Sequence, residues 1–108
     1  MTFQFSRCIC LQTPEPEKLF RFYQEMMGLA AVSAEGGIME LKAGPVRMFV
    51  DTGQTMGPIM EFLVPDVEKA REELVRRGCE VIRWEGARKP CYIRDPFGFV
   101  FNLHPDKD

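Results

Sequence analysis

The stretch Cys8-Ile9-Cys10-Leu11-Gln12-Thr13-Pro14-Glu15 decides the fold, because it returns 51 residues later as Ile59-Met60-Glu61-Phe62-Leu63-Val64-Pro65-Asp66. Both copies end in a proline and an acidic residue, and Glu-Lys follows each of them, at positions 17–18 and 68–69. A long repeat that occurs only twice differs from a solenoid, which needs about three or more units. The sequence therefore predicts one domain, residues 1–108, made of two similar modules, about 1–52 and 57–108.

Each copy begins the same order of elements. Proline and acidic residues favour helix starts after both copies, and Gly28 and Gly78 favour the helix ends. Helices are thus expected between Pro14 and Gly28 and over 67–77. Alternating apolar runs predict the strands, at 3–13, 29–34, 38–41 and 46–50 in the first module and at 59–64, 79–84, 90–94 and 99–104 in the second.

The connections complete the predicted topology. Turns are expected at Glu35-Gly36-Gly37 and at Ala43-Gly44-Pro45, and a linker over 51–57. Right-handed crossovers place each helix on one face of its sheet. The predicted fold class is α+β, with two tandem βαβββ modules that form a curled, barrel-like mixed sheet and carry their helices on the outer face.

Charge and composition exclude several classes of partner. The 14 basic and 16 acidic residues give a formal net charge of −2, which argues against a broad basic face for nucleic acid. No apolar run approaches the roughly 20 residues of a membrane span, and the first residues lack the hydrophobic region of a signal peptide. A chain of 108 residues leaves much apolar surface uncovered, so we expect a homodimer.

The four cysteines lack the spacing of a zinc site. In a strand, Cys8 and Cys10 would point the same way about 6.6 to 7 Å apart, which is too far for an easy disulfide. We therefore predict four reduced thiols in a cytoplasmic protein.

The joint order of three motifs resembles the vicinal oxygen chelate superfamily, also called the glyoxalase/bleomycin-resistance/dioxygenase fold. These motifs are Leu19-Phe20-Arg21-Phe22-Tyr23 with Met27-Gly28-Leu29, Leu63-Val64-Pro65-Asp66 with Glu68-Lys69-Ala70, and Arg94-Asp95-Pro96-Phe97-Gly98. The resemblance implies a divalent metal held by His or Glu on the first and last strand of each module. By position it carries those roles to Cys8, Met48, Ile59 and Asn102. None of the four is His or Glu, so the resemblance implies that no metal cofactor is held here.

Strand alternation extends the expected cleft face beyond these positions. Residues two away on the same strand share a face, which adds Cys10, Gln12, Glu61, Leu63, Val100 and His104. The intervening residues are all apolar, as expected beneath the helices: Ile9, Leu11, Met60, Phe62, Phe101 and Leu103. A slip of one residue would bury Gln12 and Glu61 under the helices.

Several of these side chains have more than one interpretation. Glu61 is either a ligand-binding or general-base carboxylate, or half of an ion pair at a seam. His104, the only histidine, is an acid/base, an orienting donor or a metal ligand, or has no chemical role at the end of a strand. Trp84 either stacks on a planar ligand or packs in the core. Cys8 and Cys10 suit packing better than nucleophilic chemistry, and Met48 would make a pocket adaptable.

These patterns favour a metal-independent small-molecule-binding protein of the glyoxalase/bleomycin-resistance type, which sequesters an organic ligand in a dimer cleft. A planar or cationic ligand would suit the residues expected to bind it, which are Cys8, Cys10, Gln12, Met48, Ile59, Glu61, Trp84, Asn102 and His104. The alternative is a metal-dependent lyase or isomerase resembling lactoylglutathione lyase, with Glu61 as base and Cys10 and His104 in a displaced metal site. A regulatory or accessory domain is a third hypothesis.

Overall fold

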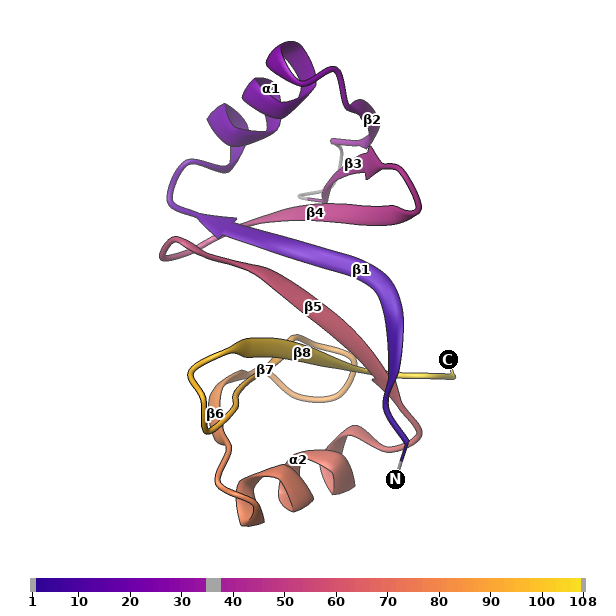
Figure 1. The fold of residues 1–108 in the computed structure, drawn as a ribbon, viewed down its shortest axis with the longest axis vertical. Helices are drawn as coiled ribbons and strands as arrows, with labels where there is room; N and C mark the ends of the chain where they lie inside the picture. The colour runs from indigo at the N-terminus through magenta and orange to yellow at the C-terminus, as the bar shows by residue number, and fades with distance from the viewer. Residues whose placement is uncertain (1, 35–37, 108) are drawn as a thin grey trace. The chain divides into compact units, whose positions relative to one another are not determined.

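The computed structural model describes residues 2–34 and 38–107, and it has the predicted α+β fold of two βαβββ modules (Figure 1). The first module consists of β1 (Gln4–Thr13), α1 (Pro16–Met26), β2 (Ala30–Ser33), β3 (Met39–Ala43) and β4 (Val46–Thr52). The second consists of β5 (Met56–Val64), α2 (Val67–Arg76), β6 (Glu80–Trp84), β7 (Cys91–Arg94) and β8 (Val100–Pro105).

The order of elements is as predicted, but the linker is not. The expected linker over 51–57 is wrong in extent, because β4 continues to Thr52 and β5 already begins at Met56. The two strands are instead joined by a short connection that contains Gly53 and Gln54. The predicted turn at Glu35-Gly36-Gly37 lies outside the described residues.

The chain divides into two compact units. Arg7–Ile59 form the first, called here the N-terminal unit. The residues up to Ser6 together with those from Met60 onward form the second, called the C-terminal unit. Strands β1 and β5 therefore contribute residues to both units.

In the N-terminal unit the strands are ordered β2-β3-β4-β1, with β1 parallel to β4 and the other pairs antiparallel. Helix α1 begins with Pro16, whose missing N–H suits the first helical position. Its Phe20 packs with Leu41 of β3 and Val50 of β4 in a buried cluster. The helix thus covers one face of this sheet, and the described residues of this unit place no helix on the other, which is called here the helix-free face.

In the C-terminal unit the strands are ordered β5-β8-β7-β6, with β5 parallel to β8. Asp66 caps α2, since its carboxylate accepts a hydrogen bond from the backbone N–H of Lys69 at 3.0 Å. The core beneath α2 consists of Val64, Ala70, Cys91, Ile93 and Leu103, with Phe62 and Phe101 packed against it.

The predicted helix-side placement of three residues in this unit is confirmed and that of a fourth is wrong. Leu103 is buried in the core, and the rings of Phe62 and Phe101 meet edge to face with centroids 5.7 Å apart. Met60 was expected beneath a helix as well, but it is 46% exposed. Met60 is the first residue of β5 in the C-terminal unit, and it lies two residues before Phe62, where the core beneath α2 begins on this strand.

Two further findings concern the membrane and the thiols. Among the described residues, neither helix has the length and apolar character needed to cross a membrane. Among the described residues, none of the four cysteines forms a disulfide. Burial raises the pKa of the Cys91 thiol, and to a smaller extent the positive charge of Arg71 opposes this.

Candidate functional site

The helix-free face of the C-terminal unit carries a hydrogen-bonded pair, Glu61 and Asn102. The strand register places Glu61 of β5 opposite Asn102 of β8, and Asn102 opposite Tyr92 of β7. The Asn102 Nδ2 donates to Glu61 Oε2 at 3.2 Å, and the Asn102 Oδ1 accepts from the backbone N–H of Cys91 at 2.8 Å. Because Cys91 fixes which end of the amide is the oxygen, the amide's donor end is turned toward the Glu61 carboxylate.

This pair gives the face a positioned acceptor. An ionised carboxylate has about four lone-pair sites, and the Asn102 amide donates to one Glu61 oxygen. Glu61 is half-buried, which strengthens its interactions relative to those of a fully solvated carboxylate. A ligand with an N–H, O–H or cationic group therefore finds a suitable partner here.

His104 lies on the same face as Glu61 and Asn102, but its ring contacts the backbone rather than these side chains. It is opposite Leu63 in the register, and its Nδ1 lies 2.9 Å from the backbone carbonyl oxygen of Pro105. That nitrogen donates in the tautomer that makes the contact a hydrogen bond. His104 is therefore oriented by the backbone at the end of β8.

The helix-free face of the N-terminal unit carries an ion pair that the sequence analysis missed. Arg47 of β4 donates from Nε to Glu40 Oε2 at 2.8 Å and from Nη2 to Glu40 Oε1 at 2.9 Å. Its Cζ atom also lies 5.1 Å from the centroid of the Phe49 ring. Cys8 pairs with Arg47 in the register, and Cys10 with Phe49. The face thus presents two thiols, a bidentate ion pair and an aromatic ring.

Burial and the positive charge of Arg47 act in opposite directions on the pKa of Glu40. Its side chain is 7% exposed, whereas that of Arg47 is 60% exposed. The hydrogen bonds from Arg47 hold the pKa of the Glu40 carboxyl below its ordinary value, although burial alone would raise it. Alternation in the sequence indicates the face of each residue but not their contact, because Glu40 stands between two apolar residues and Arg47 between Val46 and Met48.

The expected cleft position of Met48 is wrong. Met48 packs on the helix side, against the cluster that contains Leu41 and Val50. Alternation along β4 explains this, since Met48 and Val50 share one face and Arg47 and Phe49 share the other. The β4 residue that lies beside Cys8 on the helix-free face is Arg47.

Of the two interpretations of Trp84, packing in the core is the one that the structure shows, so Trp84 does not join the expected ligand-binding residues on the helix-free face. Trp84 lies opposite Cys91, whose side chain belongs to the core beneath α2, and the Cζ atom of Arg71 lies 4.2 Å from the Trp84 ring centroid. The register of β6 shifts between Val81 and Arg83, and this irregularity reverses the alternation of the residues that follow. As a result, Val81 and Trp84 both face the core although they are three residues apart.

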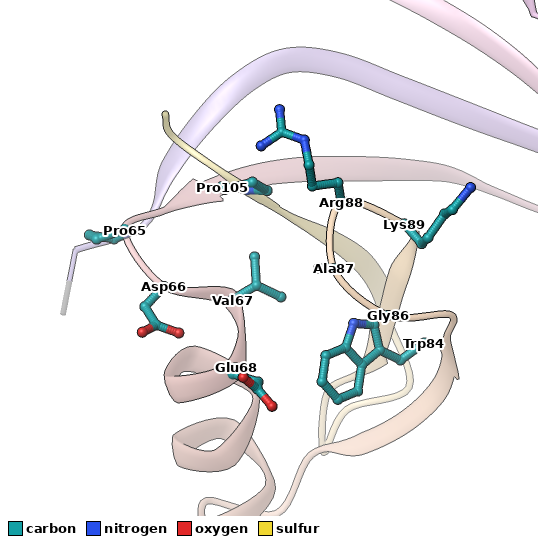
Figure 2. A pocket seen from close by; sticks show the side chains of 10 residues that line it. All are labelled: Pro65, Asp66, Val67, Glu68, Trp84, Gly86, Ala87, Arg88, Lys89 and Pro105. Carbon is teal, nitrogen blue, oxygen red and sulfur yellow. The ribbon is translucent and has the colours of Figure 1, made fainter. Parts of the chain in front are cut away.

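Trp84 lines a cavity on the helix side of the C-terminal unit. The cavity has a volume of about 530 Å³, and Figure 2 shows it between the first turn of α2 and the loop that carries Arg88 and Lys89. The Trp84 indole N–H is buried and has no hydrogen-bond partner among the described residues. The cavity does not include Glu61, Asn102 or His104, so it is separate from the face described above.

Of the remaining predicted site residues, two are buried and two are half-buried. Gln12 is 9% exposed, and its Nε2 donates to the backbone carbonyl oxygen of Gln54 at 2.9 Å, which holds the connection between β4 and β5. Ile59 is 1% exposed. Cys8 and Cys10 are half-buried.

The residues at the expected metal-ligand positions do not fit a metal ion. They supply a thiol from Cys8, an alkyl group from Ile59 and an amide from Asn102, and the β4 residue beside Cys8 is Arg47 rather than the expected Met48. An alkyl group and a protonated guanidinium have no lone pair to donate, and catalytic zinc sites use about three His, Cys, Asp or Glu ligands. Over residues 2–34 and 38–107, no group of three or more such side chains is placed to hold a metal ion.

The glyoxalase-like domain family matches the chain over residues 8–104. The chain belongs to this family. The match covers both modules, and with the fold it confirms the predicted membership of the vicinal oxygen chelate superfamily.

Solved structures share the fold of this glyoxalase-like chain at low sequence identity. A hypothetical protein from Bacillus halodurans C-125 is 13% identical, with a TM-score of 0.62 over 100% of this chain and 97% of that one. A variant of homoprotocatechuate 2,3-dioxygenase from B. fuscum is 18% identical, with a TM-score of 0.64 over 98% of this chain and 33% of the dioxygenase. These likenesses show the fold alone. No curated protein matches the chain by sequence.

Proposed function

We propose that this glyoxalase-like protein binds a small organic molecule without a metal ion, with Glu61 and Asn102 at the centre of the site. The observation that carries the proposal is the 3.2 Å hydrogen bond from the Asn102 amide to the Glu61 carboxylate. Asn102 stands where the superfamily resemblance implies a metal ligand, and here its side chain orients a neighbouring acceptor. The site is therefore suited to hydrogen-bond recognition rather than to Lewis-acid chemistry.

The chemistry of this face defines a class of ligand. A single half-buried carboxylate favours a partner that brings a positive charge or several donors, because an unpaired charge is costly to desolvate. Tyr92, which pairs with Asn102 in the register, is buried beneath this surface, and the Arg83 Cζ atom lies 5.4 Å from its ring centroid. We therefore propose a planar, cationic or donor-rich organic ligand that is sequestered as in bleomycin-resistance-type proteins.

The proposal includes a homodimer in the cytoplasm. Reduced cysteines persist most readily in a reducing compartment, and none of the four cysteines forms a disulfide among the described residues. Large apolar side chains are exposed at several places, including Phe97 at 84% and Phe99 at 72%. Such surface favours association between chains.

A thermal-shift screen in the presence of EDTA tests the proposal. The probes are bleomycin and a panel of aromatic amines and amidines. We expect at least one probe to raise the melting temperature of the wild-type protein, equally with and without EDTA, because bound ligand stabilises the folded state. The rise should be lost in Glu61→Gln and kept in Glu80→Gln, a matched control whose carboxylate is exposed on β6 and paired with Arg94.

The alternative lyase function predicts other results. Turnover of the methylglyoxal–glutathione hemithioacetal that disappears with EDTA would establish a metal-dependent enzyme. Ligand binding that is the same in Glu61→Gln and wild type would place the site elsewhere on the chain.

A further inference from the structure

The two helices of the duplicated modules differ on their outer faces. The 51-residue offset that relates the modules matches two pairs of core-facing residues on the helices. It matches Leu19 with Ala70 and Tyr23 with Leu74, and each of these packs against the core of its own unit. The exposed residues of the two helices can therefore be compared position by position.

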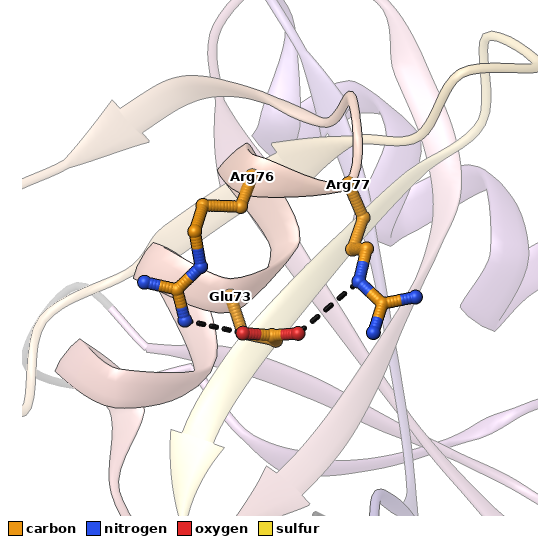
Figure 3. A network of polar contacts seen from close by, with 3 residues as sticks. All are labelled: Glu73, Arg76 and Arg77. Carbon is orange, nitrogen blue, oxygen red and sulfur yellow. Dashed lines mark hydrogen bonds and ion pairs between the residues drawn. The ribbon is translucent and has the colours of Figure 1, made fainter.

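Helix α2 has a charged outer face. The Glu73 carboxylate forms ion pairs with Arg76 and Arg77, and its Oε1 lies 3.2 Å from Arg77 Nε (Figure 3). The side chains of Arg76 and Arg77 are 67% and 78% exposed. This is the usual arrangement for a helix face in contact with water.

Helix α1 is apolar at two of the three matching positions, and Glu25 matches Arg76 at the third. Phe22 corresponds to Glu73 and is 55% exposed, and Met26 corresponds to Arg77 and is 72% exposed. Met27, directly after the helix, is 57% exposed. A group of large apolar side chains on one helix is typical of an interaction surface, whereas isolated ones are ordinary.

We infer that a second copy of this chain covers the outer face of α1, in an antiparallel pair of α1 helices. Lys18, Phe22, Glu25 and Met26 are spaced i, i+4, i+7 and i+8, so they lie on one face. A two-fold axis near Phe22 would place Lys18 of one copy beside Glu25 of the other, twice in each dimer. The same face thus supplies both the apolar centre and the opposite charges at its ends.

The existing contacts of Lys18 do not oppose this pairing. Its Nζ lies 2.9 Å from Glu15 Oε1, but the two side chains are 77% and 62% exposed. Exposed ion pairs contribute little to stability, so the exchange of partners costs little. Charge complementarity of the face with itself favours a second copy over an unrelated partner.

This inference rests on the proposed function only for the homodimer and does not depend on the ligand. A failed ligand screen would contradict the Glu61 site but not the α1 interface. A monomeric protein would contradict the α1 interface but not the Glu61 site. The two proposals are therefore tested separately.

Analytical ultracentrifugation of the full chain tests the interface. We expect the wild type to form dimers, and we expect Phe22→Glu combined with Met26→Arg to raise the dimer Kd at least about 30-fold, as for the loss of one strong interface residue. These substitutions install the residues that α2 carries, which suits them to an exposed helix face. Val75→Glu is the matched control, since Val75 is 45% exposed on α2, and it should leave the Kd unchanged.

Charge reversal tests the antiparallel arrangement. Lys18→Glu and Glu25→Lys should each raise the dimer Kd, and the double variant should return it toward the wild-type value. A wild type that stays monomeric, or a Phe22/Met26 variant that dimerises like the wild type, would overturn the interface. A double charge variant that remains as weak as the single variants would overturn the antiparallel pairing.

Discussion

Removal of Arg47 should destabilise the protein more than removal of the charge of Glu40, its ion-pair partner. Removal of Arg47 leaves a carboxylate whose side chain is 7% exposed without its ion-pair partner, which costs on the order of 1–3 kcal/mol. Removal of the Glu40 charge leaves a guanidinium that is already 60% exposed, so only a hydrogen-bond contribution of about 0.5–1.5 kcal/mol is lost. We therefore expect Arg47→Met to lower the free energy of unfolding by about 2 kcal/mol and Glu40→Gln by about 1 kcal/mol.

The effect of Arg47→Met should also depend on pH. In the wild type the hydrogen bonds from Arg47 lower the folded-state pKa of Glu40 below the unfolded value of about 4.3. The pair's contribution is therefore complete above the unfolded pKa and is lost as pH falls through the folded pKa. In Arg47→Met, burial acts without the guanidinium and raises the pKa of Glu40. The deficit of this variant should thus be largest near pH 7 and should shrink as Glu40 is protonated.

Urea unfolding followed by far-UV circular dichroism measures these differences. The wild type, Arg47→Met, Glu40→Gln and the double variant should be compared at pH 7 and pH 4. The double variant should be less destabilised than the sum of the single variants, because the two side chains interact. Equal costs of the single variants, or a deficit of Arg47→Met that does not change with pH, would refute this reasoning.

Three further predictions concern other parts of the chain. Gly57→Ala should lower the melting temperature more than Gly28→Ala, because both glycines have positive φ but only a Cβ at Gly57 would lie 2.9 Å from the Cys10 carbonyl oxygen; equal shifts would contradict this. Asp95→Ala should cost about 1 kcal/mol in urea unfolding, since its Oδ1 accepts two backbone N–H groups of its own turn at 2.8 and 2.9 Å, and Asp95→Asn should recover part of the loss. Cys91 should react with Ellman's reagent only on unfolding, because burial shields its thiol and raises its pKa, and Cys91→Ala should leave the native thiol titre unchanged.

Much of the fold was predictable from the sequence, because the repeat and the helix boundaries are encoded locally. The proline at the start of α1 and the cap at Asp66 determine where the helices begin. Alternation also placed Phe62, Phe101 and Leu103 correctly beneath α2. These predictions rest on short-range patterns that tertiary contacts reinforce.

The candidate site was harder to predict, because one irregular residue in a strand changes the face on which all later side chains lie. The irregularity between Val81 and Arg83 moves Trp84 to the helix side, and nothing in the sequence of β6 marks it. Met48 was placed by family resemblance, whereas alternation within β4 would have selected Arg47. The Glu40–Arg47 contact depends on the pairing of β3 with β4, which a sequence pattern does not specify by itself.

The central claim is that this glyoxalase-like site works without a metal ion, and a calorimetric titration tests it most directly. Zn²⁺, Ni²⁺ and Mn²⁺ should each be titrated into protein that has been stripped with EDTA and returned to metal-free buffer. Since the residues at the expected ligand positions do not form a metal-binding set, the account predicts no stoichiometric binding at micromolar concentrations. Binding of one ion per chain that is abolished by Glu61→Gln would contradict it.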